Sequence, residues 1–322
     1  MHVLGSTGVP RNSERPDSPA EQAEGGRLRW VLDLVRLARP LHSVKAVFFV
    51  PLALIDAWPW NVAMAGRIAW AVGAFMLASA AVYVGNDIAD RHRDGRHEVK
   101  CHRPIASGRI PVPVGYLYCA GLLASLGAVL AFAPVPSWPV LVYLGLNVAY
   151  SLVLKHVPLV DLSAVGLGFV LRVVQGYLAV GEPVAHWLLV TVLAVSVLFL
   201  LGKRRQELLG AGAVHRPALR GYTVELTGWL MQVTSVFALI SGLMYLGTGA
   251  SLSRDHGQTA MALSAPFALF IVFRYLQIQL TSRNDGDPVR HLLRDRTLQC
   301  ACALWAVAFS VLFVLGHHPA AP

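Results

Sequence analysis

Three aspartates, Asp87, Asp90 and Asp94, follow a long apolar run at intervals of three and four residues. If the helix predicted for that run continues past Asn86, this spacing places the three carboxylates on one face, with the Asn86 amide beside them. Like charges on one face repel each other, so a cation is expected among them. Oxygen ligands of this kind suit Mg²⁺, which usually binds one or two carboxylates together with substrate phosphates. The pattern therefore predicts a site for Mg²⁺ and an anionic substrate, and its alternative is a solvated, charge-balanced loop.

Basic residues follow the aspartates and gather again later in the chain. The first group could hold the anionic remainder of a substrate by charge-assisted hydrogen bonds, and it comprises Arg91, Arg93, Arg96, Lys100 and Arg103. The second group ends another apolar run and comprises Lys203, Arg204 and Arg205, with Glu207 beside them. The two groups occupy the same relative position at the end of a run, four runs apart. This spacing predicts a pseudo-repeated bundle whose charged helix ends face one another across a cavity.

Two arginines lie inside apolar runs, Arg172 in GFVLRVVQG and Arg274 in IVFRYLQ. An arginine at the centre of a membrane helix costs roughly 2.5–3.5 kcal/mol on insertion scales, so a polar interior is expected to receive these side chains. Arg274 lies some six residues, or ~9 Å, from the end of its run and could reach the same cavity. Its alternative is to extend toward the lipid headgroups.

The elements that would position these side chains are membrane helices. Of the 322 residues, 55% are hydrophobic and 14% are charged, whereas roughly 25% are charged in soluble domains. Nine uncharged or nearly uncharged runs approach the ~20 residues that a helix needs to cross a bilayer. The predicted spans are 41–57, 68–85, 114–133, 138–153, 159–180, 186–202, 228–248, 260–280 and 298–316. We therefore expect an all-α polytopic membrane protein with nine transmembrane helices.

The positions of Lys and Arg predict the orientation of this bundle. Of the 27 such residues, 23 fall on the side of the N-terminus, and only Arg67 and Arg254 fall on the other side. By the positive-inside rule, the N-terminus and both charged groups face the cytoplasm, and the C-terminus lies outside the cell membrane. The same rule accounts for the net charge of +9, so this charge is no argument for nucleic-acid binding.

The predicted domain organisation has three parts. Residues 1–26 are polar and rich in Pro, Gly and Ser, which predicts a disordered cytoplasmic tail. Residues 27–39 alternate apolar and basic side chains at helical spacing, which predicts an amphipathic helix in the membrane interface, ended by Pro40. Residues 40–318 form the predicted transmembrane domain, which contacts the membrane lipids.

Several segments together resemble one protein family. NDIADRHRD at 86–94, followed by Lys100 and by RPIASG at 103–108, is similar to the first aspartate-rich motif of the UbiA superfamily of intramembrane prenyltransferases. The resemblance extends from residue 36 over nearly the whole chain and includes RPLHSVKAVFFVPL, YSLVLKHVPLVDLSAVGLGFVLRVVQG, LGKRRQEL and RNDGDPVRHLLRDR. The phosphoribosyl branch is the most similar, because KRRQE stands where aromatic prenyltransferases have a second aspartate-rich motif. This chain departs from the branch at Lys45-Ala46 and His97-Glu98. The family implies a bundle of nine helices, in agreement with the nine runs.

The resemblance also implies the residues of a site. It implies that Asn86, Asp87, Asp90 and Asp94 bind Mg²⁺ and diphosphate, and that the three aspartates are the catalytic residues. By position, it implies phosphate contacts from Lys45, Lys100, Arg103, Lys203 and Arg204. Further implied substrate contacts are Tyr83, Lys155, Asp161, Arg172, Glu207, Tyr222 and Arg274.

The implied reaction moves a 5-phosphoribosyl group from 5-phosphoribosyl 1-diphosphate to a polyprenyl (decaprenyl-type) phosphate, with Mg²⁺ and with release of diphosphate. The segment from Lys203 to Glu225 has a surplus of basic residues, which we interpret as the pocket for the donor's 5-phosphate. Two alternatives keep other chemistries open. One is a UbiA-type transfer of a prenyl chain from its diphosphate to an aromatic ring, and the other is a transporter with charged gates.

Overall fold

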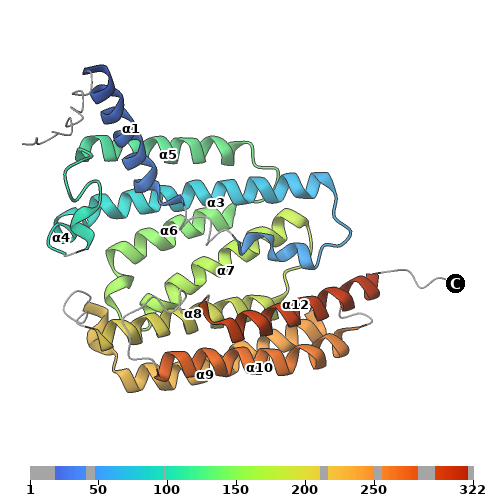
Figure 1. The fold of residues 1–322 in the computed structure, drawn as a ribbon. Helices are drawn as coiled ribbons and strands as arrows, with labels where there is room; N and C mark the ends of the chain where they lie inside the picture. Colours follow the sequence, from blue (N-terminus) through green and yellow to red (C-terminus); the bar gives the residue numbers. More distant parts are fainter. Residues whose placement is uncertain are drawn as a thin grey trace, which may run out of the picture.

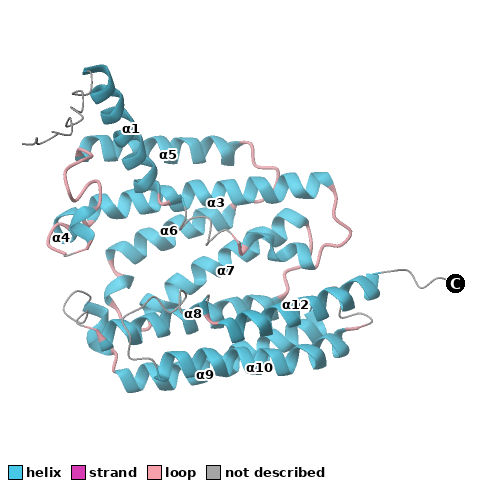
Figure 2. Cartoon of the chain, viewed as in Figure 1, coloured by secondary structure: helices cyan, strands magenta, loops and turns pink. Residues whose placement is uncertain are grey.

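The computed structural model of the chain describes residues 19–40, 48–97, 99–210, 217–249, 256–281 and 294–317. Within these ranges the chain is helical and contains no strand (Figures 1 and 2). Six described segments are long and apolar enough to cross a membrane. Five are single helices: α3 (Val62–Ala89), α5 (Val112–Ala131), α7 (Val160–Val180), α8 (His186–Leu209) and α10 (Gly257–Thr281). The sixth, Val224–Gly249, consists of α9 (Val224–Met244) and the π-helical turn η6 (Tyr245–Gly249). Two further helices, α6 (Trp138–Leu152) and α12 (Arg296–His317), contain shorter apolar stretches.

Eight of the nine predicted spans correspond to these helices, and the all-α fold is confirmed. The predicted first span, 41–57, differs. Residues 41–47 lie outside the described part of the chain, and the described remainder contains the 3₁₀ helix η1 (Val50–Ile55). Pro51 stands in the first turn of η1, and Asp56 follows its last residue. The count of nine membrane helices therefore stays a prediction.

The N-terminal helix α1 (Pro19–Ala38) begins earlier than expected. Residues 19–26, which the composition assigns to a disordered tail, form its first turns; Ala, Glu and Gln are good helix formers, and Pro is well suited to a first helical position. The helix ends before Arg39, whose left-handed φ of 49° cannot continue a right-handed helix. Residues 1–18 of the predicted tail lie outside the described residues.

Helix α1 rests on the rest of the molecule through both apolar and charged contacts. Leu37 is fully buried against Val84 and Ile88 of α3. Arg109 donates a hydrogen bond from Nε to Asp33 Oδ2 at 2.9 Å. These contacts fix the C-terminal end of α1 next to the end of α3, where the aspartate motif lies.

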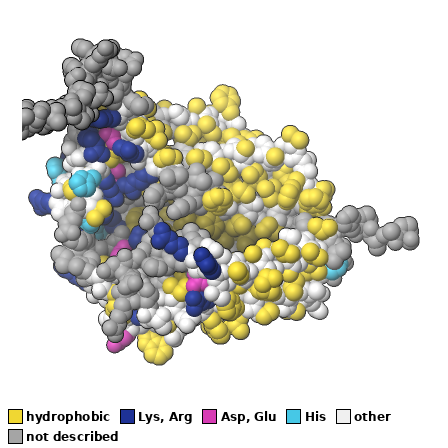
Figure 3. Space-filling model, in the orientation of Figure 1, with side chains coloured by type: hydrophobic (Ala, Val, Ile, Leu, Met, Phe, Trp, Pro, Cys, Tyr) yellow, Lys and Arg dark blue, Asp and Glu magenta, His cyan; other side chains and the backbone are white. Residues whose placement is uncertain are grey.

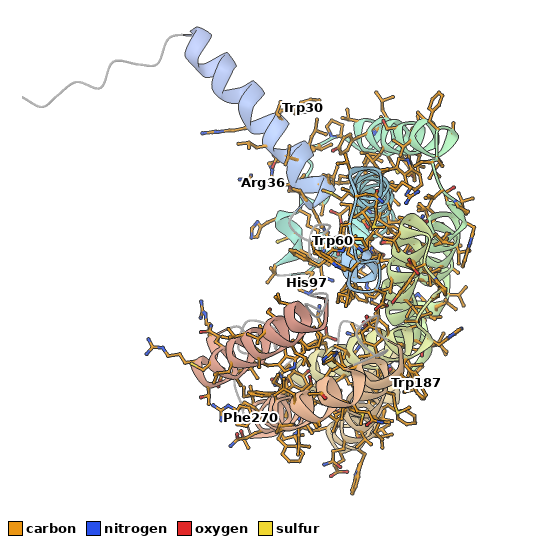
Figure 4. All side chains as sticks on the ribbon, turned by 90° about the vertical axis from the view of Figure 1, so that its right-hand side faces the viewer. Trp30, Arg36, Trp60, His97, Trp187 and Phe270 are labelled. Carbon is orange, nitrogen blue, oxygen red and sulfur yellow. The ribbon has the colours of Figure 1, made fainter. Side chains whose placement is uncertain are left out.

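The helices of the bundle form a curved row. Helix α3 packs on α5, α6 and α7, helix α7 packs on α8, and the row continues through α9 and α10 to α12. Seen from the side, this row curves into an arc (Figure 4). Lys and Arg side chains gather at the end of the bundle near α4 (Arg91–Asp94), whereas hydrophobic side chains are most abundant toward the right-hand side of the face shown in Figure 3.

The largest buried cluster joins η1 to α3, α7 and α8. A Cβ on Gly176 would lie 2.1 Å from the carbonyl oxygen of Val50, so only glycine allows this approach of η1 to α7. Asp56 completes the junction, because its carboxylate accepts hydrogen bonds from the hydroxyls of Tyr177 in α7 and, at 3.0 Å, Tyr245 in η6. Segments far apart in the chain thus meet at the end of the bundle opposite to the aspartate motif.

Candidate active site

The aspartate motif lies where α3 ends and α4 begins. Arg103 donates from Nη1 to Asp87 Oδ1 at 3.0 Å and to Asp94 Oδ2 at 2.5 Å. Arg39, the residue after α1, donates from Nη2 to the same oxygen of Asp87 at 2.5 Å. The side chains of Asp87 and Asp94 are only 3% and 5% exposed. Two of the predicted carboxylates are therefore buried and close enough to share one cation.

Asp90 has a different partner. It is the C-cap of α3 and, with φ −90° and ψ 3°, interrupts the helix between Asp87 and Asp94. Its Oδ1 accepts a hydrogen bond at 3.1 Å from Lys155 Nζ, in the short helix η3 (Leu154–His156). The single uninterrupted helix assumed for the three carboxylates is thus divided at Asp90 into α3 and α4. Among the described residues, no three His, Cys, Asp or Glu side chains gather into a metal site.

The pair of Asp87 and Asp94 nevertheless fits Mg²⁺ bound together with a phosphorylated substrate, since this ion usually takes one or two carboxylates and completes its shell with phosphates and water. The Arg103 guanidinium lies between the two carboxylates, so a positive charge already bridges them. Asn86 lies one residue before the pair begins, and its Oδ1 accepts a hydrogen bond from Ser151 Oγ at 2.5 Å. The donor set is thus oxygen-rich and matches a hard ion.

A cavity of about 210 Å³ lies beside the motif, between α3, α6 and α7. Its polar lining comes from Tyr83, Asn86, Tyr143, Asn147, Tyr150 and Arg172. The guanidinium of Arg39 lies over the Tyr83 ring, 5.2 Å from its centroid, so one arginine contacts both Asp87 and the wall of the cavity. The aspartate site and the cavity are therefore adjacent.

Arg172 is 4% exposed, in agreement with the interior position expected for it. Its Nη1 donates to the Gly168 carbonyl at 2.6 Å, and its Nη2 donates to Ser79 Oγ at 3.0 Å. Three aromatic rings lie 4.4, 5.1 and 5.6 Å from the guanidinium carbon: Tyr143, Phe75 and Phe169. Arg172 forms no ion pair with a carboxylate among the described residues.

Arg204, the buried member of the second basic group, is already paired with two acids. Arg204 donates from Nε and Nη2 to Asp161 Oδ2 at 3.1 and 3.0 Å, and from Nη1 to Glu207 Oε2 at 2.9 Å. The Tyr222 hydroxyl donates to Asp161 Oδ1 at 2.8 Å and accepts from the Leu159 amide at 2.6 Å. Burial raises the pKa of Tyr222, so its hydroxyl stays protonated and can donate. With Arg204 and Asp161 3% and 0% exposed, this network ties α7 and α8 together, and its geometry argues against the implied substrate contacts of these four residues.

Arg274 does not reach the cavity either. Its Nε and Nη2 donate to Asp295 Oδ2 at 3.1 and 2.6 Å, and the other oxygen of Asp295 accepts from the Leu298 amide at the start of α12. The hydrogen bond from Arg274 lowers the pKa of Asp295 from its usual value. Arg274 thus joins α10 to α12, which neither the cavity expectation nor the headgroup alternative foresaw.

The remaining implied contacts have varied positions. Lys203 is exposed on α8, and Lys100 begins the 3₁₀ helix η2 (Lys100–His102) between the aspartates and Arg103. Lys45 lies outside the described residues. Sequence reasoning missed Arg39, Tyr143, Asn147 and Tyr150 at the site. Of these, Arg39 stands in the RPLHSVK segment that carries the family resemblance, which is the signal that could have found it.

The fold and the site together define a multi-pass membrane protein with paired buried carboxylates at one end of its helices. The model of the UbiA prenyltransferase family matches residues 46–294. The chain therefore belongs to the UbiA prenyltransferase family, which confirms the resemblance read from its motifs.

Relatives and solved structures agree with this assignment. A Mycolicibacterium smegmatis protein named decaprenyl-phosphate phosphoribosyltransferase is 30% identical, over 89% of this chain and 94% of the relative. A Corynebacterium glutamicum protein of the same name is 28% identical, over 93% and 90%. The structure of a UbiA homologue from Archaeoglobus fulgidus bound to DMAPP and Mg²⁺ has a TM-score of 0.63 at 20% identity, over 88% of this chain and 99% of the other. This last similarity confirms the fold.

Proposed function

We propose that this protein transfers a 5-phosphoribosyl group from 5-phosphoribosyl 1-diphosphate to a polyprenyl (decaprenyl-type) phosphate, with release of diphosphate. The observation that carries the proposal is the cavity between the aspartate motif and Arg172, in whose lining six polar or charged side chains gather. Its amide, phenol and guanidinium groups suit a phosphorylated sugar, and apolar side chains such as Val82, Leu146 and Phe169 form the rest of its walls. The two relatives named decaprenyl-phosphate phosphoribosyltransferase support the same substrates.

The donor's diphosphate would lie at the aspartate motif. Asp87 and Asp94 would hold Mg²⁺, with Asn86 and Asp90 beside them, and the bound ion would neutralise the charge that builds on the leaving diphosphate. Arg103 is well placed to move from the carboxylates to phosphate oxygens, since both are anionic partners for the same charge-assisted hydrogen bonds.

In the transfer itself, a phosphate oxygen of the lipid acceptor attacks the ribose C1. The bond from C1 to the diphosphate oxygen breaks, and its electron pair leaves with the diphosphate. C1 passes through an oxocarbenium-like state, as in other glycosyl transfers. The acceptor phosphate is already ionised near neutral pH, so the reaction needs no strong general base. Positioning of the two substrates and stabilisation of charge can supply most of the rate.

The lipid acceptor places this chemistry in a membrane. We assign the protein to the cell (inner or plasma) membrane, with its N-terminus and active site on the cytoplasmic side and its C-terminus outside. The gathering of Lys and Arg at the end of the bundle that carries α4 supports this orientation (Figure 3).

The deciding experiment incubates the purified protein in detergent with radiolabelled 5-phosphoribosyl 1-diphosphate, polyprenyl phosphate and Mg²⁺. We expect labelled product in the organic phase, and none when either Mg²⁺ or the lipid is left out. A parallel reaction contains a prenyl diphosphate and an aromatic acid. Product in the parallel reaction alone would replace the proposal with an aromatic prenyltransferase.

A further inference from the structure

Arg172 and Arg204 are both buried, but different groups surround their guanidinium charges. Arg204 contacts two carboxylates, those of Asp161 and Glu207. Arg172 forms an ion pair with no described acid, and its partners are a carbonyl, a hydroxyl and three aromatic rings. Removing a cation from water costs several kcal/mol unless an anion compensates it. The interior of the bundle therefore holds a positive charge for which an anionic ligand would be the natural partner.

The guanidinium is held in place and retains unused donor capacity. Hydrogen bonds to Gly168 and Ser79 fix its two terminal nitrogens, and the surrounding rings restrict its rotation. Its Nε is buried and has no hydrogen-bond partner. A fixed guanidinium with unused N–H groups is well suited to bind a phosphate, by two parallel hydrogen bonds where the geometry allows.

The cavity connects this cation to the aspartate motif. Arg172 is bonded to Ser79, which precedes Asn86 by seven residues of α3, or about 10 Å along the helix axis. A five-carbon sugar with a phosphate at each end can span this separation. Between the two ends, the walls carry Tyr83, Asn147 and Tyr150, whose polar groups could bind ribose hydroxyls.

We propose that Arg172 binds the 5-phosphate of the donor at the inner end of this cavity while the diphosphate lies at the aspartate motif. This inference rests on the proposed function, and it identifies the side chain that binds the 5-phosphate end of the donor. It departs from the interpretation that the segment from Lys203 to Glu225 holds the 5-phosphate; Arg204, the buried arginine of that segment, is already paired with Asp161 and Glu207. The lipid acceptor also ends in a phosphate, so the test must separate the two substrates.

The binding test uses ribose 5-phosphate, which carries the 5-phosphate but no diphosphate, and needs no Mg²⁺. We expect it to raise the Tm of the detergent-solubilised wild-type protein, and Arg172→Gln to abolish that rise. Diphosphate with Mg²⁺ should still raise the Tm of Arg172→Gln, which shows that the variant is folded. The matched control is Arg220→Gln, which removes an exposed arginine of the rival segment and should keep the response to ribose 5-phosphate. No response of the wild type, or a retained response in Arg172→Gln, would overturn the proposal.

The kinetic test compares both substrates in Arg172→Gln and in Arg172→Lys, which keeps the charge and loses the paired donors. We expect the KM for 5-phosphoribosyl 1-diphosphate to rise at least tenfold in Arg172→Gln, less in Arg172→Lys, and the KM for polyprenyl phosphate to change less than twofold. A rise confined to the lipid's KM would assign Arg172 to the acceptor phosphate and refute the proposal. If the wild type shows the Arg172-dependent binding of ribose 5-phosphate but forms no product, the proposed reaction fails while the phosphate site stands.

Discussion

Asp90 is the most accessible member of the aspartate motif, with 34% of its side chain exposed against 3% for Asp87. Its ion pair with Lys155 is half-exposed, and such pairs contribute little to stability. We therefore expect Asp90→Asn to keep the wild-type Tm while lowering kcat/KM at least tenfold, or about 1.4 kcal/mol of transition-state stabilisation. Steady-state kinetics and thermal unfolding on the same preparation measure both quantities.

Asp87→Asn is the informative comparison for this prediction. Because Asp87 is buried and paired with two arginines, its replacement should lower both activity and Tm. Near-normal activity in Asp90→Asn would remove Asp90 from the site, and near-normal activity in both variants would remove the metal assignment.

Arg204 is expected to act on stability. Breaking a buried ion pair by removing one partner costs about 3–5 kcal/mol, so Arg204→Ala should lower the Tm strongly, and Asp161→Asn should do the same. The double variant Arg204→Met/Asp161→Leu removes both charges and should unfold at a higher temperature than either single variant. Thermal unfolding of the three proteins measures the effect. An unchanged Tm with a raised KM for the donor would return Arg204 to the phosphate-binding residues.

The residues of the site were predictable where local spacing decides their position. The three-and-four spacing from Asp87 to Asp94 brought out the motif, and the apolar surroundings of Arg172 indicated an interior charge. Partners distant in the chain could not be found in this way. No spacing rule joins Arg39 to Asp87, and none reveals that the partner of Arg204 stands 43 residues earlier, at Asp161.

At the scale of elements, the crossing of η1 and α7 depends on Gly176. An added Cβ would meet the Val50 carbonyl at 2.1 Å and force the two helices apart. Overpacking of this kind typically costs 1–3 kcal/mol, so we expect Gly176→Ala to lower the Tm. The control is Gly145→Ala in α6, where a Cβ would meet nothing within 4 Å. Equal Tm values for the two variants would show that η1 does not press on α7.

Apolar length predicted the positions of eight helices because the bilayer fixes how long a spanning helix must be. It could not predict the type of helix at η1, since hydropathy reports burial and not backbone geometry. The start of α1 was predicted too late, because the polarity of the segment was considered and its helix propensity was not. The segment PAEQAEGG is polar, which reads as a tail, yet most of its residues favour a helix.

At the scale of the whole molecule, the charge asymmetry predicts the topology. A reporter fused at residue 322 should read as extracytoplasmic, and one inserted near residue 212 should read as cytoplasmic. Paired alkaline phosphatase and green fluorescent protein fusions at both positions measure this, since the two reporters are active on opposite sides of a bacterial membrane. The reverse pattern would mean that the number of spans or the orientation is wrong.

The contact of Asp56 with two tyrosines constrains the order in which parts of this protein assemble during synthesis. Asp56 leaves the ribosome early, but its partner Tyr245 is 189 residues further along the chain. At about 5–20 residues per second, the carboxylate waits on the order of 10–40 s before that hydroxyl has even been synthesised. During this interval the early helices must reside in the membrane without the Tyr245 contact at the end opposite to the aspartate motif. A ribosome that stalls before Tyr245 would therefore leave a half-assembled bundle, and we expect quality-control proteases to recognise it at this end.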